Sequence, residues 1–322
     1  MLVALASAGV AQLKITHKWL GEERPGITQK GQRTLGCYAP QLKGTLTELT
    51  KHAANKKDSV AAAAWRVLAF SGTGSSMRNG HQMKVMKSQL LVLTARVAYK
   101  DEVPPPRGRI TRSEECLANL AIVRCQREAN YKLLRKYVAR GLERLLKRFP
   151  EQDTAAPTAE ETLYLTLLAD SLIKTRWDVQ GQTFLELAQR GVAATPPGKS
   201  RFYDAMRHFL ALIAGEKEID PELTTALCWP GDPLKAPLHA FLGAYTLRVM
   251  PPNVRAAHWP YAQRLLQRRE KGQLWPAATN FDRKTTASIM TAIVGMSFGK
   301  SGALPLGYTP PKKEDPWKHP FR

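Results

Sequence analysis

"SEECLANLAIVRCQREANYKLLRKYVARGLERLLKRFP", residues 113–150, is the longest helical stretch of the chain. Ser113 precedes two acidic residues, which favour a helix N-terminus, and Pro150 ends the stretch. The pattern therefore predicts one helix from Ser113 to Phe149. Its apolar face, which we expect to dock on a neighbouring helix, includes Leu117, Leu120, Leu134, Val138, Leu145 and Phe149.

Cations recur at every fourth residue in the second half of this stretch. They are Lys132, Lys136, Arg140, Arg144 and Arg148. Like charges at this spacing each lower helix stability by about 0.2–0.5 kcal/mol, so an external anion is expected to compensate. Successive cations rise about 6 Å along the helix, close to the phosphate spacing of a nucleic-acid strand. The alternative is a solvated face on which Glu128 and Glu143 pair with Lys132 and Lys147.

Other basic segments precede and follow this row. "RNGHQMKVMK" and "PRGRITR" precede it, and "QRLLQRREK" lies near the C-terminus. If the row is only a solvated face, we expect the charge to act through arms around 14–33 and 312–322. The residues predicted to contact phosphate are Lys84, Lys87, Arg107, Arg109, Arg112, Arg124, Arg127, Lys132, Lys136, Arg140, Arg144, Lys147 and Arg148.

The overall charge indicates the class of partner. Lys and Arg number 48 against 27 Asp and Glu, so the net charge is +21. Such a chain repels itself unless a polyanion is near: nucleic acid, an anionic membrane surface or an acidic protein. Dispersed cations, interleaved aromatics and extended arms favour a structural RNA-binding protein embedded with other proteins in a large ribonucleoprotein, such as an organellar ribosome or a nucleocapsid. An accessory subunit of a mitochondrial membrane complex is an alternative.

Helix signals recur along the rest of the chain. Thr158 and Glu161 form a capping box, Asp58 is a good N-cap, and Gly215 is a good helix end. "QLLVLTARVAY" could be a strand, but its context favours a helix. We predict an all-α fold, an array of helical hairpins that is either a solenoid or α/α-barrel-like. Residues 1–45 are expected to form an arm, 46–306 the helical domain with an internal boundary at 103–109, and 307–322 a tail.

Motifs for catalysis, metals and nucleotides are missing from the sequence. The four cysteines and seven histidines have no metal-ligand spacing. "GVAATPPGKS" and "GMSFGKS" have the wrong number of residues between their glycines for a phosphate-binding loop. We therefore expect no cofactor, no metal and no enzymatic activity. No segment is long and apolar enough to span a bilayer. The cysteine pattern indicates a reducing intracellular compartment, and the mitochondrion is one such compartment.

Residues 236–298 resemble a repeat of the squalene-cyclase and prenyltransferase type. "PLHAFLGAYTLRVM", "WPYAQRLLQRREKGQLWPA" and "KTTASIMTAIVGMSF" read as helices joined by a Gln-rich turn, with Gln267, Gly272 and Trp275 at the matching places. Two residues separate Gly272 from Trp275, where the family usually has one. The resemblance implies an α/α toroid. The family's Asp-x-Asp-Asp acid motif is missing, so the resemblance does not carry cyclase chemistry to this chain.

Overall fold

The computed structural model describes most of the chain between residues 39 and 298. The described residues are 39–53, 59–73, 75, 82–99, 110–129, 132–150, 155–173, 175–215, 229, 231–249, 259–270 and 274–298. Within them the chain forms eleven α-helices and one short 3₁₀ helix, with no strand. The prediction of an all-α fold is therefore confirmed, and residues 89–97 lie in a helix.

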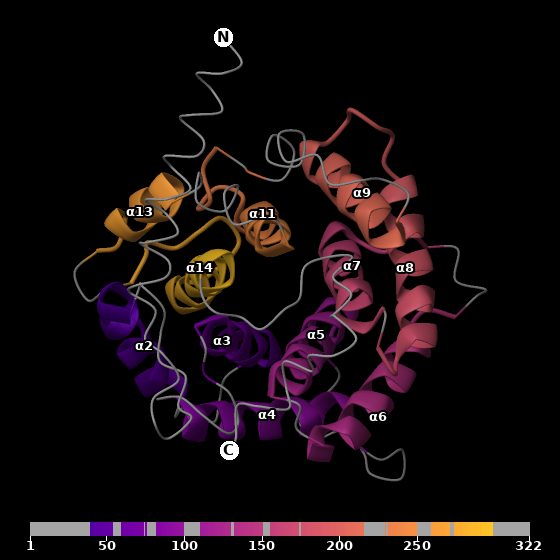
Figure 1. The fold of residues 1–322 in the computed structure, drawn as a ribbon, viewed down its shortest axis with the longest axis horizontal. Coiled ribbons are helices and arrows are strands. Elements are labelled where there is room, and N and C mark those ends of the chain that lie inside the picture. Colours follow the sequence, from indigo (N-terminus) through magenta and orange to yellow (C-terminus); the bar gives the residue numbers. More distant parts are fainter. Residues whose placement is uncertain are drawn as a thin grey trace, which may run out of the picture.

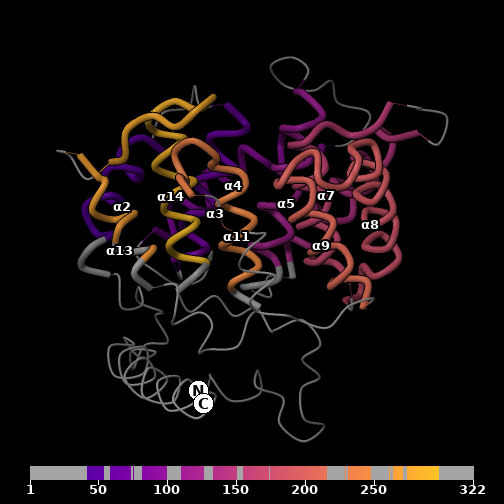
Figure 2. Tube along the Cα trace, turned by 90° about the horizontal axis from the view of Figure 1, so that it is seen from above, coloured from indigo at the N-terminus to yellow at the C-terminus, as the bar shows by residue number. Residues whose placement is uncertain are grey.

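The helices form two layers (Figure 1). An inner ring contains α3 (Val60–Gly72), α5 (Arg112–Ala129), α7 (Ala159–Leu172), α11 (Pro237–Val249) and α14 (Arg283–Phe298). Each inner helix packs on the next, and α14 packs on α3, which closes the ring. Outer helices cover it: α2 (Ala39–Ala53), α4 (Met83–Val97), α6 (Arg135–Leu146), α8 (Asp178–Ala193), α9 (Arg201–Ala214) and α13 (Trp259–Gln267). Seen at right angles, α5, α7, α8 and α9 lie side by side at one end (Figure 2).

The sequence of each helix explains its layer. In α3 nearly every residue is buried, as expected of a helix that is apolar almost all round, and in α7 the buried set also includes polar residues such as Thr162 and Thr166. In α6, by contrast, only one stripe is buried, comprising Val138, Gly141, Leu142 and Leu145. One continuous set of buried side chains joins both layers from Leu42 to Met296. The arrangement is a closed ring of helical hairpins.

The long helix predicted for residues 113–149 is in fact two helices. The first, α5, ends at Ala129, a 3₁₀ turn η1 spans Lys132–Leu134, and α6 then folds back against α5. A single helix of this length would extend about 55 Å and could not bury the two different apolar patterns of its halves. The apolar side chains predicted to dock are buried nonetheless.

Three other boundaries can be compared with the sequence. The capping box is confirmed: Glu161 N donates to Thr158 Oγ1 (3.3 Å) and Thr158 N donates to Glu161 Oε2 (2.8 Å). Ser59, and not Asp58, caps α3 by accepting from Ala62 N at 3.1 Å. Helix α2 begins at Ala39, inside the predicted arm, and buries Leu42 in the core. The predicted boundary at 103–109, the rest of the arm and the tail lie outside the described residues.

Candidate nucleic-acid interface

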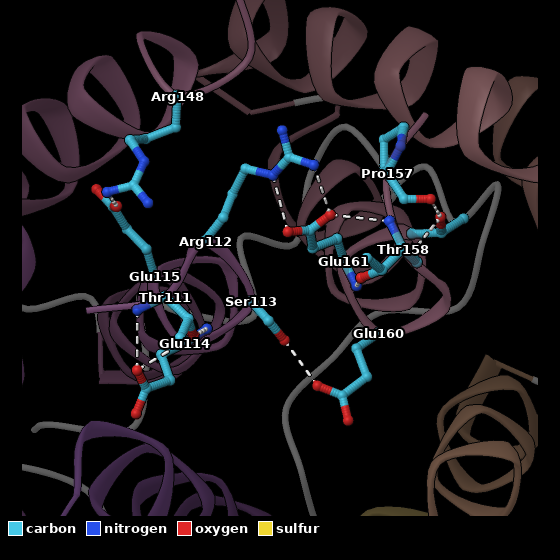
Figure 3. Close-up of polar contacts among 11 residues, drawn as sticks. Thr111, Arg112, Ser113, Glu114, Glu115, Arg148, Pro157, Thr158, Glu160 and Glu161 are labelled. Atoms are coloured by element: carbon cyan, nitrogen blue, oxygen red, sulfur yellow. Dashed lines mark hydrogen bonds and ion pairs between the residues drawn. The ribbon is translucent and has the colours of Figure 1, made fainter. Parts of the chain in front are cut away.

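Two of the predicted phosphate-binding arginines instead hold inner and outer helices together (Figure 3). Arg112, at the start of α5, donates from Nε to Glu161 Oε1 (2.8 Å) and from Nη2 to Glu161 Oε2 (3.0 Å). Its guanidinium also lies 4.5 Å from the centre of the Phe149 ring. Arg148 pairs with Glu115 at 3.2 Å. Ser113 Oγ donates to Glu160 at 2.7 Å, which adds a second residue pair between α5 and α7.

The pKa values of the two buried carboxylates, Glu115 and Glu161, shift in opposite directions. Burial raises the pKa of Glu115, and the positive charges of Arg148 and Arg144 only partly oppose it. Burial also acts on Glu161, but hydrogen bonds from Arg112 and Thr158 outweigh it and hold the pKa of Glu161 below its ordinary value. Because both carboxylates need their arginines in the folded protein, Arg112 and Arg148 serve the fold. A phosphate would have to displace Glu161 or Glu115 to bind either arginine.

Arg124 is also misassigned by the sequence pattern. Its side chain is 2% exposed, and its Nη1 donates to the hydroxyl of Tyr245 on α11 at 3.4 Å. That hydroxyl donates to Asp170 Oδ2 (2.8 Å) and shares a hydrogen bond with Ser171 Oγ (2.9 Å). The network joins α5, α7 and α11 inside the ring. An arginine enclosed in this way cannot lie along an external phosphate backbone.

Two other predicted cations, Arg144 and Lys147, have partners outside the core. Arg144 donates to the hydroxyl of Tyr99, just past α4, and its guanidinium lies 3.7 Å from the centre of that ring. Lys147 pairs with Glu143 at 3.3 Å, with both side chains more than half exposed. Exposed pairs of this kind contribute about 0.2–1 kcal/mol and exchange partners readily. Lys147 therefore stays accessible, whereas Arg144 serves the contact between α4 and α6.

Four predicted residues remain on the outside of α4 and α6, and we call them the basic face. Lys84, Lys87 and Lys136 are exposed and Arg140 is half-exposed. In the described part of the chain, none of the four forms an ion pair. Helix α4 contains no acidic residue, and α6 contains only Glu143. The charged residues of these two helices are therefore mostly positive.

Helix geometry places Arg140 on the flank of α6 that lies next to α4. Leu133, Arg140 and Arg144 follow one another at intervals of seven and four residues, so they share one flank of η1 and α6. Arg144 on that flank reaches Tyr99, and α4 packs beside α6. The flank that carries Arg140 therefore borders α4. The two helices that carry the basic face are thus neighbours, and Lys136 and Arg140 are the members of the predicted row that belong to it.

Four predicted residues lie wholly or in part outside the described structure. Arg107 and Arg109 lie outside the described residues. Arg127 is in α5 and Lys132 is in η1, but the structure does not describe their side chains.

Sequence reasoning missed three apolar residues of this surface. Leu91, Val92 and Leu133 are 69%, 37% and 63% exposed. The sequence of α4 contained a signal for Leu91. Leu90 and Leu93 belong to the buried stripe of this helix, and Leu91 lies outside that stripe by helical periodicity. The basic face thus includes apolar area that could contact a base or a protein as well as phosphate.

Among the described residues, no three His, Cys, Asp or Glu side chains gather as a metal site would require. Cys116 and Cys125 are buried thiols of α5, and burial raises the pKa of Cys116 well above its ordinary value. In the described residues, helices of sufficient length and apolarity to cross a membrane are not found.

Neither the family models nor the curated proteins match the sequence, and no solved structure matches the fold.

Proposed function

We propose that this protein is a non-catalytic structural component of a ribonucleoprotein and binds RNA phosphates through the basic face. The observation that supports it is the set of four cations on α4 and α6 that, within the described residues, have no acidic partner. Each phosphate contact releases counterions from the nucleic acid, which favours binding at low salt. A net charge of +21 adds long-range attraction.

The test is the salt dependence of RNA binding. A variant in which the four residues of the basic face are replaced by Gln should fold normally, because exposed substitutions change stability by no more than about 0.5 kcal/mol each. The slope of log K against log salt should fall by about 3 to 4, the sum of about 0.7–0.9 for each lost contact. Fluorescence anisotropy with a labelled RNA over a series of salt concentrations measures it.

A control variant removes the same charge from other exposed positions. The four residues to replace by Gln are Lys199, Lys235, Arg264 and Lys284. If RNA binds through the basic face, this control keeps most of the wild-type slope. An equal loss in both variants would show that only the net charge matters. An unchanged slope in the first variant would rule out the basic face as the RNA site.

The second candidate function is an α/α-toroid protein that binds an apolar ligand inside its ring. The supporting observation is local: α11, α13 and α14 lie where the squalene-cyclase and prenyltransferase resemblance expects helices. Trp275 of the connecting turn is fully buried and donates to Leu265 O at 2.7 Å. This candidate predicts that a prenyl alcohol raises the melting temperature independently of salt, and that RNA does not.

A further inference from the structure

A cleft lies between the outer helices α6 and α8. Its volume is about 530 Å³, within the range of roughly 300–1,000 Å³ typical of ligand sites. Leu146, Phe149, Pro150 and Leu187 provide its apolar surface, and the half-exposed Thr183 also lines it. The cleft is therefore apolar inside and open along two exposed helices.

The two helices that border the cleft end at the same edge of the ring. Arg148, just past α6, pairs with Glu115 in the first turn of α5. Gly191, in the last turn of α8, contacts Thr162 in the first turn of α7. The two hydrogen bonds from Arg112 to Glu161 join the starts of α5 and α7. The ends of α6 and α8 lie beside these two starts, so α6 and α8 run in the same direction. Residues that occupy equivalent turns thus face each other across the cleft.

Charges on the rim of the cleft are ordered. Glu143 on α6 and Glu186 on α8 occupy one level, and Lys147 and Arg190 follow four residues later on the same two helices. Four residues correspond to about 6 Å along a helix. The rim therefore has an acidic level and, one turn further, a basic level. The glutamates would repel a phosphate backbone, so this surface does not fit RNA.

We propose that the cleft binds an amphipathic helix of another protein. Its apolar side chains would fill the space beside Leu146 and Leu187, in the way helices dock in grooves through residues one turn apart. Basic side chains of the partner would face Glu143 and Glu186, and acidic side chains one turn further would face Lys147 and Arg190. The pair between Glu143 and Lys147 is exposed, so its groups can pair with a partner at little cost. This proposal does not depend on RNA binding.

Two synthetic helical peptides of identical composition test the charge order. Both carry the same leucine stripe, but in one the lysines precede the glutamates in the direction of α6, and in the other they follow. Since several rim pairs change together, the matching peptide should bind about tenfold more tightly to the intact protein. Equal affinities, or binding of neither peptide, would overturn the proposal.

Exchanging the charges on the protein should reverse this preference. The exchanged variant carries Glu143→Lys, Lys147→Glu, Glu186→Arg and Arg190→Glu, which leaves the net charge unchanged. Its control exchanges an exposed pair on α2, Glu48→Lys with Lys51→Glu, and should keep the wild-type preference. Circular dichroism checks that both variants fold. A preference that persists in the exchanged variant would contradict the proposed pairing of charges.

A third variant tests the cleft itself. Thr183→Trp places a large side chain in the opening and should abolish peptide binding. Val179→Trp, one turn earlier on α8 where the side chain is 77% exposed, should have no effect. Sedimentation velocity on the wild type provides a further check. A dimer that Thr183→Trp dissociates would identify a second copy of this chain as the occupant and refute a separate partner.

Discussion

At the scale of single residues, two buried carboxylates determine what the nearby arginines can do. Glu161 and Glu115 are 4% exposed, and each lies beside an arginine from another turn or helix. A buried ion pair adds little net stability over an apolar pair, but loss of one partner leaves the other charge buried. Arg112 and Arg148 are therefore committed to the α5–α6–α7 contact, and an external anion would have to compete with it.

Replacing Glu161 by Gln should lower the free energy of unfolding by about 3 kcal/mol. The change leaves Arg112 without its carboxylate and weakens the capping box at the start of α7. Urea denaturation at neutral pH measures the loss. Glu186→Gln, at an exposed position on α8, is the control and should change stability by no more than about 0.5 kcal/mol. Similar losses in both variants would argue against a stabilising Arg112–Glu161 ion pair.

The pH dependence of stability should differ between the two carboxylates. The pKa of Glu161 is lowered in the folded state, so its stabilisation is present above its ordinary value of 4.5 and is lost as pH falls. The pKa of Glu115 is raised, so its contribution is present below 4.5 and is lost as pH rises through the folded value. Between neutral pH and pH 4, Glu161→Gln should therefore lose less stability than wild type, and Glu115→Gln more.

Sequence could not reveal these pairs, for a physical reason. Arg112 and Glu161 are 49 positions apart, and they meet only because α5 and α7 run side by side. The same applies to Arg124, whose partner Tyr245 is 121 positions away. Local periodicity shows which residues share a helix face. It does not show which face another helix covers, so a row of cations looked uniform although its members have different surroundings.

At the scale of elements, sequence patterns predicted helix boundaries correctly where the stabilising contacts lie within a few residues of each other. The capping box of α7 spans four residues and its geometry follows from sequence alone. The break between α5 and α6 was not predicted, because Ser113 and Pro150 alone set the ends of the stretch, although Asn130 is a residue type that is frequent at helix ends. The change of apolar pattern would have located it: residues 116–125 are buried all round, whereas α6 buries a single stripe.

Closure of the ring depends on the contact between α3 and α14. A Cβ added at Gly295 would lie 2.7 Å from the carbonyl carbon and 2.8 Å from the oxygen of Gly72, both backbone atoms that cannot rotate away. Gly295→Ala should therefore force the helices apart and lower stability by about 1–3 kcal/mol. Chemical denaturation measures it. Gly231→Ala, where no atom lies within 4 Å, should be nearly neutral, and equal effects would contradict a close α3–α14 crossing.

At the scale of the whole molecule, the fold must tolerate a large net charge. A charge of +21 destabilises the compact state through self-repulsion, while the single buried core and the closed ring oppose it. Added salt screens exposed charges over distances of about 10 Å, so it should raise the melting temperature. That effect reports charge alone. A specific polyanion should stabilise the folded protein further by binding it in preference to the unfolded chain.

The melting temperature in the presence of RNA should separate these effects. At equal ionic strength, RNA at about 100 times its dissociation constant should add about 2.7 kcal/mol of stability, or several degrees for a chain of this size. The variant with Gln at the four positions of the basic face should lose most of this RNA-dependent shift but keep the response to salt, since it still carries a charge of about +17. Scanning calorimetry measures both responses in one series. If RNA raises the melting temperature of wild type and variant equally, phosphate contact occurs elsewhere on the chain; if only a prenyl alcohol raises it, the ring and not the basic face holds the ligand.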